Sequence, residues 1–287
     1  MTHITVKSFI SIQERIPMDA QEDLAAGTPT AGVRGVKSAA RTVEVLEVLA
    51  ARGNEPVTVR ELCEAVDAPR SSMYALLRTL TDLGWVRSDS TRSLYSIGIR
   101  ALLAGTTYLD TDPLLQVIYP HVEQVSTRLE ETVHYGRLDR TDMVYLATHQ
   151  SLAYERTRNR VGRRLPAYST SLGKAVLAQF DDAELDAHLP ARLTALTPHT
   201  ITSREALKED LAATRARGYS IDAEENTLGL RCFGVALPIR AGISDALSCS
   251  VPIERLTPEH EQDIIDALIS TADVTLQIVR GLGGLLS

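Results

Sequence analysis

Apolar residues recur every three or four positions in the first third of the chain, between short polar breaks. Residues 36–51 are predicted to form an amphipathic helix, because a single apolar stripe runs along them. That stripe consists of Ala39, Val43, Leu46 and Leu49. A short second helix is predicted from Thr58 to about Asp67. Thr58 and Glu61 have the spacing of a capping box, in which two side chains satisfy free amides of the first turn.

A third helix is predicted after Pro69, whose fixed backbone suits a first helical position. Its inward side consists of Met73, Leu76, Leu77, Leu80 and Leu83. Gly84 follows, and a glycine readily takes the left-handed conformation that ends a helix. Residues 85–88 and 93–97 then alternate in polarity around a polar turn, which predicts a hairpin.

Two short helices joined by a tight turn and followed by a hairpin predict a winged helix-turn-helix. In this motif the second helix enters the DNA major groove by its N-terminal residues. The side chains expected to contact DNA are Arg70, Ser71, Ser72, Tyr74 and Arg78 on the third helix and Arg87 and Arg92 on the hairpin. A polar helix tip is also typical of a solvated cap. The order of the elements, more than the tip itself, favours DNA binding.

Charge is distributed unevenly along the 287 residues, a length that suits two domains. Apolar content of 44% and charged content of 23% are those of an ordinary globular protein. Residues 33–109 hold ten Lys and Arg and eight Asp and Glu, a net of +2, although the whole chain carries −7. One segment therefore suits a polyanion and the rest does not.

Several classes of protein are disfavoured by composition. The three cysteines, Cys63, Cys232 and Cys249, have no metal-ligand spacing and are odd in number, which favours a reduced, cytoplasmic protein. No HExxH motif is present, so we expect neither a metal nor another cofactor. No apolar run reaches 18 residues, and we expect no membrane span. Residues 1–32 are predicted to be a mobile tail, and translation starts at Met1 or Met18.

The remaining two-thirds of the chain alternate helical and strand patterns. The predicted helices cover residues 108–131, a segment that starts near Ser171, residues 203–217, and a segment that starts at Pro258. The predicted strands are a hairpin that turns at residues 139–142, an extended Leu165-Pro166, and residues 219–223, 234–239 and 246–251. A meander of strands with helices packed on the sheet is an α+β fold.

The stretch around Ser171 admits several interpretations. It has the S-x-x-K spacing of penicillin-binding enzymes, but the chain lacks their K-T-G partner motif. A Walker A loop would need a glycine where Tyr168 stands and a hydroxyl where Ala175 stands. Cys232 has no base near it in sequence. We therefore expect no catalytic residue. Two interpretations remain open: a helix N-terminus that faces a small anion, or one capped by its own side chains.

The chain resembles the IclR family of bacterial transcription regulators. "TVRELCEAVDAPRSSMYALLRTLTDLGWV" is similar to the DNA-binding motif of that family, and "GRRLPAYSTSLGKAVLA" and "ARGYSIDAEENTLGLRCFGVALPI" are similar to its ligand-binding signatures. The resemblance implies four parts: a tail over residues 1–32, a winged helix-turn-helix over 33–98, a linker helix over 99–111, and a GAF-like effector and oligomerisation domain over 112–287. The wing turn, Asp89 to Arg92, departs from the Asp-Gly turn common in the family.

The resemblance also implies an effector pocket. Its residues here would be Ser171, Leu172, Asp222, Leu230, Cys232, Ser248 and Ser250. Hydrogen-bond donors at the helix tip and an acceptor at Asp222 suit a small carboxylic acid that also bears hydroxyl groups: a sugar acid, a 2-oxo acid or a hydroxylated aromatic acid. The few aromatic residues, three Phe and one Trp, favour the sugar acids.

Two functions from different classes follow. The first is a transcription regulator that binds palindromic operator DNA as a homodimer or a dimer of dimers and responds to a small acid. The second is a small-molecule sensor or enzyme whose N-terminal domain contacts other proteins. Sequence-selective DNA binding distinguishes the two.

Overall fold

The computed structural model describes residues 35–53, 55–153, 161–239 and 245–281. The tail predicted over residues 1–32 lies outside these ranges. The chain divides into two compact units, residues 1–107 and 108–287, which we describe separately. None of the helices in the described part of the chain is both long and apolar enough to cross a lipid bilayer.

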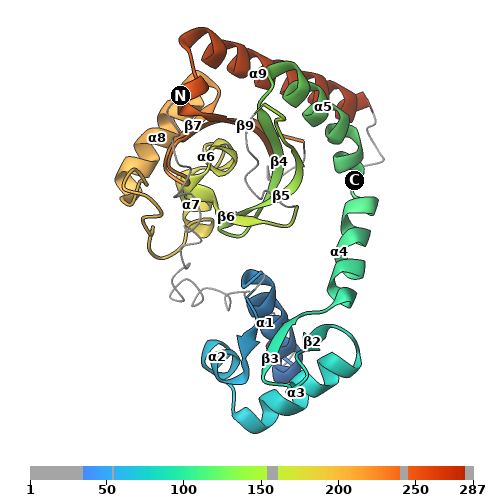
Figure 1. The fold of residues 1–287 in the computed structure, drawn as a ribbon. Coiled ribbons are helices and arrows are strands. Elements are labelled where there is room, and N and C mark those ends of the chain that lie inside the picture. The colour runs from blue at the N-terminus through green and yellow to red at the C-terminus, as the bar shows by residue number, and fades with distance from the viewer. Residues whose placement is uncertain (1–34, 54, 154–160, 240–244, 282–287) are drawn as a thin grey trace, which may run out of the picture. The chain divides into compact units, whose positions relative to one another are not determined.

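The N-terminal unit consists of short helices on a small sheet (Figure 1). In chain order the elements are α1 (Lys37–Ala51), β1 (Val57–Thr58), α2 (Val59–Ala65), α3 (Arg70–Asp82), β2 (Val86–Ser88), β3 (Leu94–Ile97) and α4 (Ile99–Thr111). The strands pair antiparallel in the order β1-β3-β2. The unit is therefore a helix-turn-helix, α2 and α3, followed by a hairpin.

Two ends of these helices lie where neighbouring residues in the sequence predicted them. Thr58 and Glu61 form the predicted capping box, and Gly84 has the left-handed backbone, with φ of +76°, that follows the end of α3. The predicted stripe of α1 was partly wrong: Val43 is 55% exposed, and Val45 and Val48 are buried instead. Because valines and leucines are frequent in α1, two sides of the helix are apolar enough to be the buried one. Packing against α2 and β3 determines which side is buried.

The C-terminal unit is built on one antiparallel sheet. Its helices are α5 (Pro113–Leu129), α6 (Ser171–Leu177), α7 (Asp182–Ala187), α8 (Arg204–Arg217) and α9 (Pro258–Gly281), with short 3-10 turns η2 (Ala167–Ser169) and η3 (Ile253–Arg255). Its strands are β4 (Thr132–Asp139), β5 (Asp142–His149), β6 (Arg164–Pro166), β7 (Ser220–Ala223), β8 (Leu230–Leu237) and β9 (Asp245–Pro252). The α+β class predicted from the sequence is confirmed.

The sheet order, β6-β5-β4-β9-β8-β7, is not the single meander that was predicted. The sheet consists of two three-stranded meanders that lie side by side. They are joined by the pairing of β4 with β9, in which Thr132 lies opposite Ser250 and Arg137 opposite Asp245. The predicted helix over residues 108–131 was also wrong in one respect. It is interrupted at Asp112, whose carboxylate accepts hydrogen bonds from the Leu114 and Leu115 amides and so starts α5 as a separate helix.

The two faces of the sheet are covered differently (Figure 1). One face packs on α5 and α9 around a core that includes Tyr135, Phe233 and Leu247. The other face packs on α6 at one end, around Met143, Leu172 and Ala246. Polar side chains occupy the rest of this second face, which we call the polar face and describe below.

Candidate DNA-binding and effector sites

The N-terminal end of α3 presents polar side chains to solvent while the opposite side of the helix is buried. Arg70 and Ser71 are exposed in its first turn, and Tyr74 is 53% exposed one turn later. Met73 and Leu77, on the other side, are fully buried. Helix-turn-helix proteins read base edges with this end of this helix. The exposed surface therefore coincides with the surface that the motif uses.

Two of the predicted contact residues also have intramolecular partners. The Ser72 hydroxyl donates a hydrogen bond of 2.9 Å to the Pro69 carbonyl. The Arg78 guanidinium lies 3.9 Å from the Asp82 carboxylate, and both side chains are exposed. An exposed ion pair between residues four positions apart contributes little to stability. The Arg78 guanidinium can therefore exchange Asp82 for a more strongly bound anion at little cost. The Ser72 hydroxyl, at the tip of this helix, has its hydrogen atom already engaged within the protein.

Asp89 organises the turn between β2 and β3. Its carboxylate accepts hydrogen bonds from the Ser93 and Leu94 amides at 2.8 and 2.9 Å and from the Thr91 hydroxyl. The Thr91 hydroxyl and the Leu94 amide thereby lower the pKa of Asp89. Arg92 takes the left-handed conformation, with φ of +55°, that an Asp-Gly turn would give to glycine. The hairpin is therefore ordered despite its unusual turn.

Arg87 and Arg92 are the predicted phosphate contacts of the hairpin, and both side chains are exposed. The Tyr95 hydroxyl donates a hydrogen bond of 2.9 Å to the Arg92 carbonyl, which fixes the backbone beneath that side chain. Two cations on an ordered hairpin can lie along a phosphate backbone without reading sequence.

In the C-terminal unit the predicted helix tip lies directly on the sheet. A Cβ atom on Gly234 would lie 2.5 Å from the Ser171 carbonyl oxygen, so only glycine lets α6 approach β8 this closely. The Ser220 hydroxyl donates a hydrogen bond of 2.6 Å to the same carbonyl. Thr170 caps the helix by accepting from the Gly173 amide at 3.0 Å. Among the described residues, no acceptor is bonded to the amides of Ser171 and Leu172.

The other predicted pocket residues share the polar face. Asp222 lies opposite Cys232, and Cys232 opposite Ser250, so three strands bring these side chains into one row. The Cys232 thiol donates to the Ser250 hydroxyl at 3.2 Å. Ser248 and Leu230 lie two residues from Ser250 and Cys232 along their strands and therefore on the same face. The structure thus brings the predicted set together.

Asp222 has an unusual electrostatic environment. Burial, and next the negative charge of Glu225, raise the pKa of Asp222 to about 7. Its carboxylate accepts a hydrogen bond of 2.7 Å from the Glu225 amide. Lys174 lies close to the Glu225 and Asp210 carboxylates, at 2.5 and 2.9 Å. Asp222 can consequently accept or donate a hydrogen bond at neutral pH.

Lys174 is also the lysine of the S-x-x-K spacing. It is fully buried, and its ammonium group is engaged by these two carboxylates. A base that activates Ser171 would have to be neutral and close to its hydroxyl. The two ion pairs hold the Lys174 side chain inside the C-terminal unit, which gives it a structural role.

Sequence reasoning missed His134, Thr148 and Tyr145 on the polar face. His134 lies opposite Ser248, its Nδ1 is 2.9 Å from the Thr148 hydroxyl, and its ring packs edge-on to Tyr145 at 5.1 Å between centroids. Burial, and then the charge of Arg163, lower the pKa of His134 to about 3. Thr132 and His134 alternate with apolar residues along β4, and this pattern was the sequence signal for His134.

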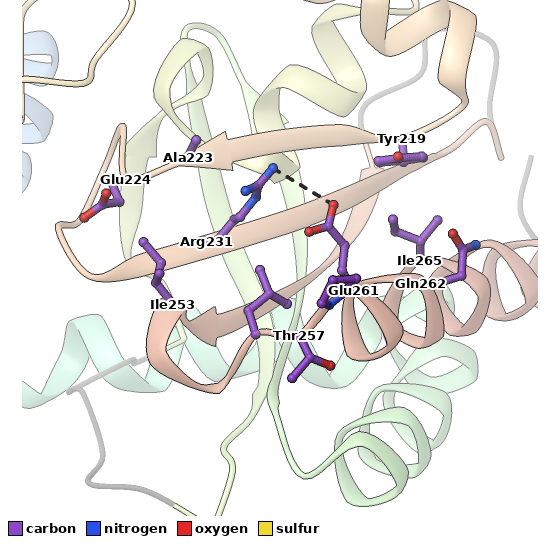
Figure 2. Close-up of a pocket in the computed structure, with 11 residues that line it drawn as sticks. Tyr219, Ala223, Glu224, Arg231, Ile253, Thr257, Glu261, Gln262 and Ile265 are labelled. Atoms are coloured by element: carbon purple, nitrogen blue, oxygen red, sulfur yellow. Dashed lines mark ion pairs between the residues drawn. The ribbon is translucent and has the colours of Figure 1, made fainter.

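A cavity of about 500 Å³ lies on the opposite face of the sheet, beside α9 (Figure 2). Arg231 and Glu261 face each other there at 4.0 Å. Its lining contains none of the predicted effector residues, so it is a separate feature. No group of three or more His, Cys, Asp or Glu side chains able to hold a metal occurs within the described ranges.

Comparison with known proteins is informative for both units. Residues 38–90 match the model of the IclR helix-turn-helix domain, and residues 106–275 match that of the bacterial transcriptional regulator IclR C-terminal domain. The transcriptional repressor IclR of Escherichia coli strain K12 is 33% identical over 267 residues, which is 91% of this chain and 97% of that protein.

Two further similarities extend this result. The HTH-type transcriptional regulator KdgR of the same organism is 34% identical over 238 residues, 82% of this chain and 90% of that one. A crystal structure of a putative transcriptional regulator from Rhodococcus is 31% identical, covers 87% of this chain and 100% of that one, and superposes with a TM-score of 0.70.

Proposed function

The chain belongs to the IclR family of bacterial transcription regulators, and from that premise we propose what its two units recognise. It is a DNA-binding transcription regulator with an effector-binding C-terminal domain. Its relatives include repressors, among them the acetate operon repressor of Salmonella typhimurium.

We propose that α3 reads operator DNA in the major groove while the hairpin binds phosphates. The observation that carries this proposal is the exposed polar tip of α3 above a buried underside, next to an ordered basic hairpin. Arg70, Ser71, Tyr74 and Arg78 would face the bases, and the Ser72 hydroxyl would exchange its bond to Pro69 for a DNA contact. Arg87 and Arg92 would add affinity without sequence preference.

We propose that the effector is a small carboxylic acid whose carboxylate lies at the Ser171 and Leu172 amides. These two donors have no acceptor among the described residues, and they lie beside the polar row of Asp222, Cys232 and Ser250. Asp222 and the serines would bind hydroxyl or oxo groups. Sugar acids, 2-oxo acids and hydroxylated aromatic acids all fit this chemistry.

We propose further that the chain works as a homodimer, assembled into a dimer of dimers. Helix α4 has no buried residue among those described, and Ile99, Leu102 and Leu103 are more than half exposed. A groove of about 450 Å³ lined by Leu83, Trp85 and Leu103 lies beside it in the N-terminal unit. A second copy, related by the two-fold axis of a palindromic operator, would cover this surface. In this proposal the protein acts in the cytoplasm, without catalysis or a metal.

A gel-shift assay with the DNA upstream of the chain's own gene tests the regulator against its rival. We expect a complex that is selective for one intergenic sequence and weakens steeply with salt. A sensor or enzyme whose N-terminal unit only contacts proteins would give no selective complex at any salt concentration. Light scattering on the same sample measures the number of copies.

A further inference from the structure

The cavity beside the start of α9 is lined by residues that the proposed function does not use (Figure 2). On one side it is bounded by the edge of the sheet, where Ala223 of β7 lies opposite Arg231 of β8. On the other side it is bounded by α9 and the segment that precedes it. Arg231 shares the face of Phe233, and its neighbour Cys232 points to the polar face. The cavity and the polar face are therefore on opposite sides of the same strand.

Arg231 has an unused hydrogen-bond donor at this cavity. Its Nε atom is buried and has no hydrogen-bond partner in the part of the chain that the structure describes. One of its other guanidinium nitrogens lies 4.0 Å from the Glu261 carboxylate, which is longer than a hydrogen bond. Figure 2 shows the two side chains directed toward each other. A ligand that supplies an acceptor to the buried donor would remove the cost of leaving it unpaired.

Glu261 is the carboxylate of the cavity that a ligand can reach. Glu224 also lines the cavity, but its carboxylate accepts a hydrogen bond of 2.7 Å from the Gly229 amide, which holds it at the turn before β8. Among the described residues, the Glu261 side chain is paired only with Arg231, across the gap of 4.0 Å. One cation and one carboxylate thus face each other without a direct hydrogen bond.

Apolar side chains surround this pair of charges. Ile253 and Ile265 lie to either side of it in Figure 2, and Tyr219 and Leu256 also line the cavity. Ile253 is 41% exposed, so an apolar group bound against it would remove apolar surface from water. The volume of about 500 Å³ is in the range of cavities that hold small molecules.

The two charges discriminate among small molecules. A carboxylic acid without an amino group would pair with Arg231 but would bring a like charge next to Glu261. An amine without a carboxylate would pair with Glu261 and be repelled by Arg231. A molecule that carries both groups on one carbon atom satisfies both side chains at once. The apolar surroundings favour such a molecule with an apolar side chain.

We propose that this cavity is a second ligand site, which binds an apolar α-amino acid. The carboxylate of the amino acid accepts hydrogen bonds from the Arg231 guanidinium, and its ammonium group donates to Glu261. Its side chain packs against Ile253, Leu256 and Ile265. This site does not depend on the acid that we propose for the tip of α6.

Calorimetric titration of the full chain tests the class of ligand. The amino acids are L-leucine and L-phenylalanine. The matched acids, 4-methylpentanoate and 3-phenylpropanoate, lack the amino group, and the matched amines, 3-methylbutylamine and 2-phenylethylamine, lack the carboxylate. In at least one set we expect the amino acid to bind on the order of 10-fold to 100-fold more tightly than its acid or its amine, the range of one charge-assisted contact.

Variants of the two charged residues test the site itself. Arg231→Gln should weaken binding of the amino acid by on the order of 10-fold or more. Glu261→Gln should also weaken it, but should bind the matched acid at least as tightly as the wild type does, because the like charge is gone. Arg128→Gln is the matched control, since it removes a cation that pairs with Asp263 of α9, outside the cavity. Circular dichroism confirms that each variant is folded.

The outcomes separate this site from the acid effector. If neither amino acid binds, or if Arg231→Gln binds them as the wild type does, the second site is overturned. If the matched acids bind as tightly as the amino acids and Glu261→Gln changes neither, the amino-acid class is wrong. Ser171→Asp is expected to bind the amino acids normally. Loss of their binding in this variant would place them on the polar face and overturn the second site.

Discussion

The guanidinium of Arg137 on β4 donates a hydrogen bond of 2.7 Å to the hydroxyl of Tyr108, near the end of α4. The same guanidinium binds the Asp245 carboxylate at 2.6 Å and the carboxylate of Asp112, the residue that starts α5. His134 and Gly136, on the same strand, lie on the polar face of the sheet. One strand therefore lines the polar face on one side and, on the other, holds Tyr108 and Asp112 of the same unit.

Replacing Arg137 with leucine should destabilise the C-terminal unit strongly. Asp112 and Asp245 are almost fully buried, and both would lose the cation that neutralises them. We expect a loss of about 3–5 kcal/mol in the free energy of unfolding, measured by urea denaturation. Arg128→Leu breaks an exposed pair with Asp263 and should cost less than about 1 kcal/mol. Equal effects of the two variants would contradict this account.

Asp222 should make the stability of the free protein depend on pH. Its pKa is about 7 in the folded state and about 3.9 in an unfolded chain. Between these values the folded state holds a proton that the unfolded state has lost, so the free energy of unfolding falls as the pH rises.

The Asp222→Asn variant keeps an oxygen acceptor for the Glu225 amide but does not titrate. Relative to the wild type, it should therefore gain stability as the pH rises from 5 to 7, by up to about 1.4 kcal/mol per pH unit. Urea denaturation of both proteins at pH 5, 6, 7 and 8 measures this difference. A constant difference across the series would show that Asp222 is ionised throughout.

The helix and the hairpin of the DNA-binding unit should fail in different ways. Arg87→Ala and Arg92→Ala should each weaken binding to every sequence and reduce the salt slope by about 0.9. Ser71→Ala should instead cost about 1–3 kcal/mol of discrimination at particular base pairs and leave the slope unchanged. Fluorescence anisotropy on operator and scrambled duplexes measures both quantities. Ser71→Ala losing affinity equally for both duplexes would contradict its role in reading bases.

Gly234 should not tolerate a methyl group. Its Cβ would lie 2.5 Å from the Ser171 carbonyl, a backbone atom, so α6 has to move away from β8. We expect Gly234→Ala to cost about 1–3 kcal/mol and to weaken effector binding. Gly105→Ala is the control, because a Cβ there meets nothing within 4 Å and alanine favours helix α4. A stable Gly234→Ala variant with normal effector affinity would mean that this close approach is not required.

The sequence predicts best those features that neighbouring residues determine. The Thr58 capping box, the glycine after α3 and the end of α8 at Gly218 depend on a few adjacent residues, and all were placed correctly. The interruption at Asp112 was missed because the apolar spacing continues through it. The break nevertheless has a local signal, because Asp112 caps α5 and Pro113 stands at the first position of that helix.

Pairing between distant strands accounts for the rest. That β4 lies beside β9 depends on residues more than 100 positions apart, and no local pattern specifies it. The effector residues expected from the family resemblance share one face, but His134 joins them only through the pairing of β4 with β5 and β9. A polar residue in a buried strand is visible in the sequence. The side chains that lie beside it are determined by strand pairing, which the sequence does not show.

The most direct test of the account is whether an acid controls operator binding through the tip of α6. The operator duplex, identified by gel shift, is titrated with the full chain, with and without the tightest-binding member of a set of sugar acids, 2-oxo acids and hydroxylated aromatic acids. The wild type should change its operator affinity on adding the acid. Ser171→Asp should bind operator normally, since an acidic residue suits the first turn of a helix, yet ignore the acid because its carboxylate repels the incoming one. An unchanged acid response in Ser171→Asp, or a response to neutral compounds alone, would contradict the account.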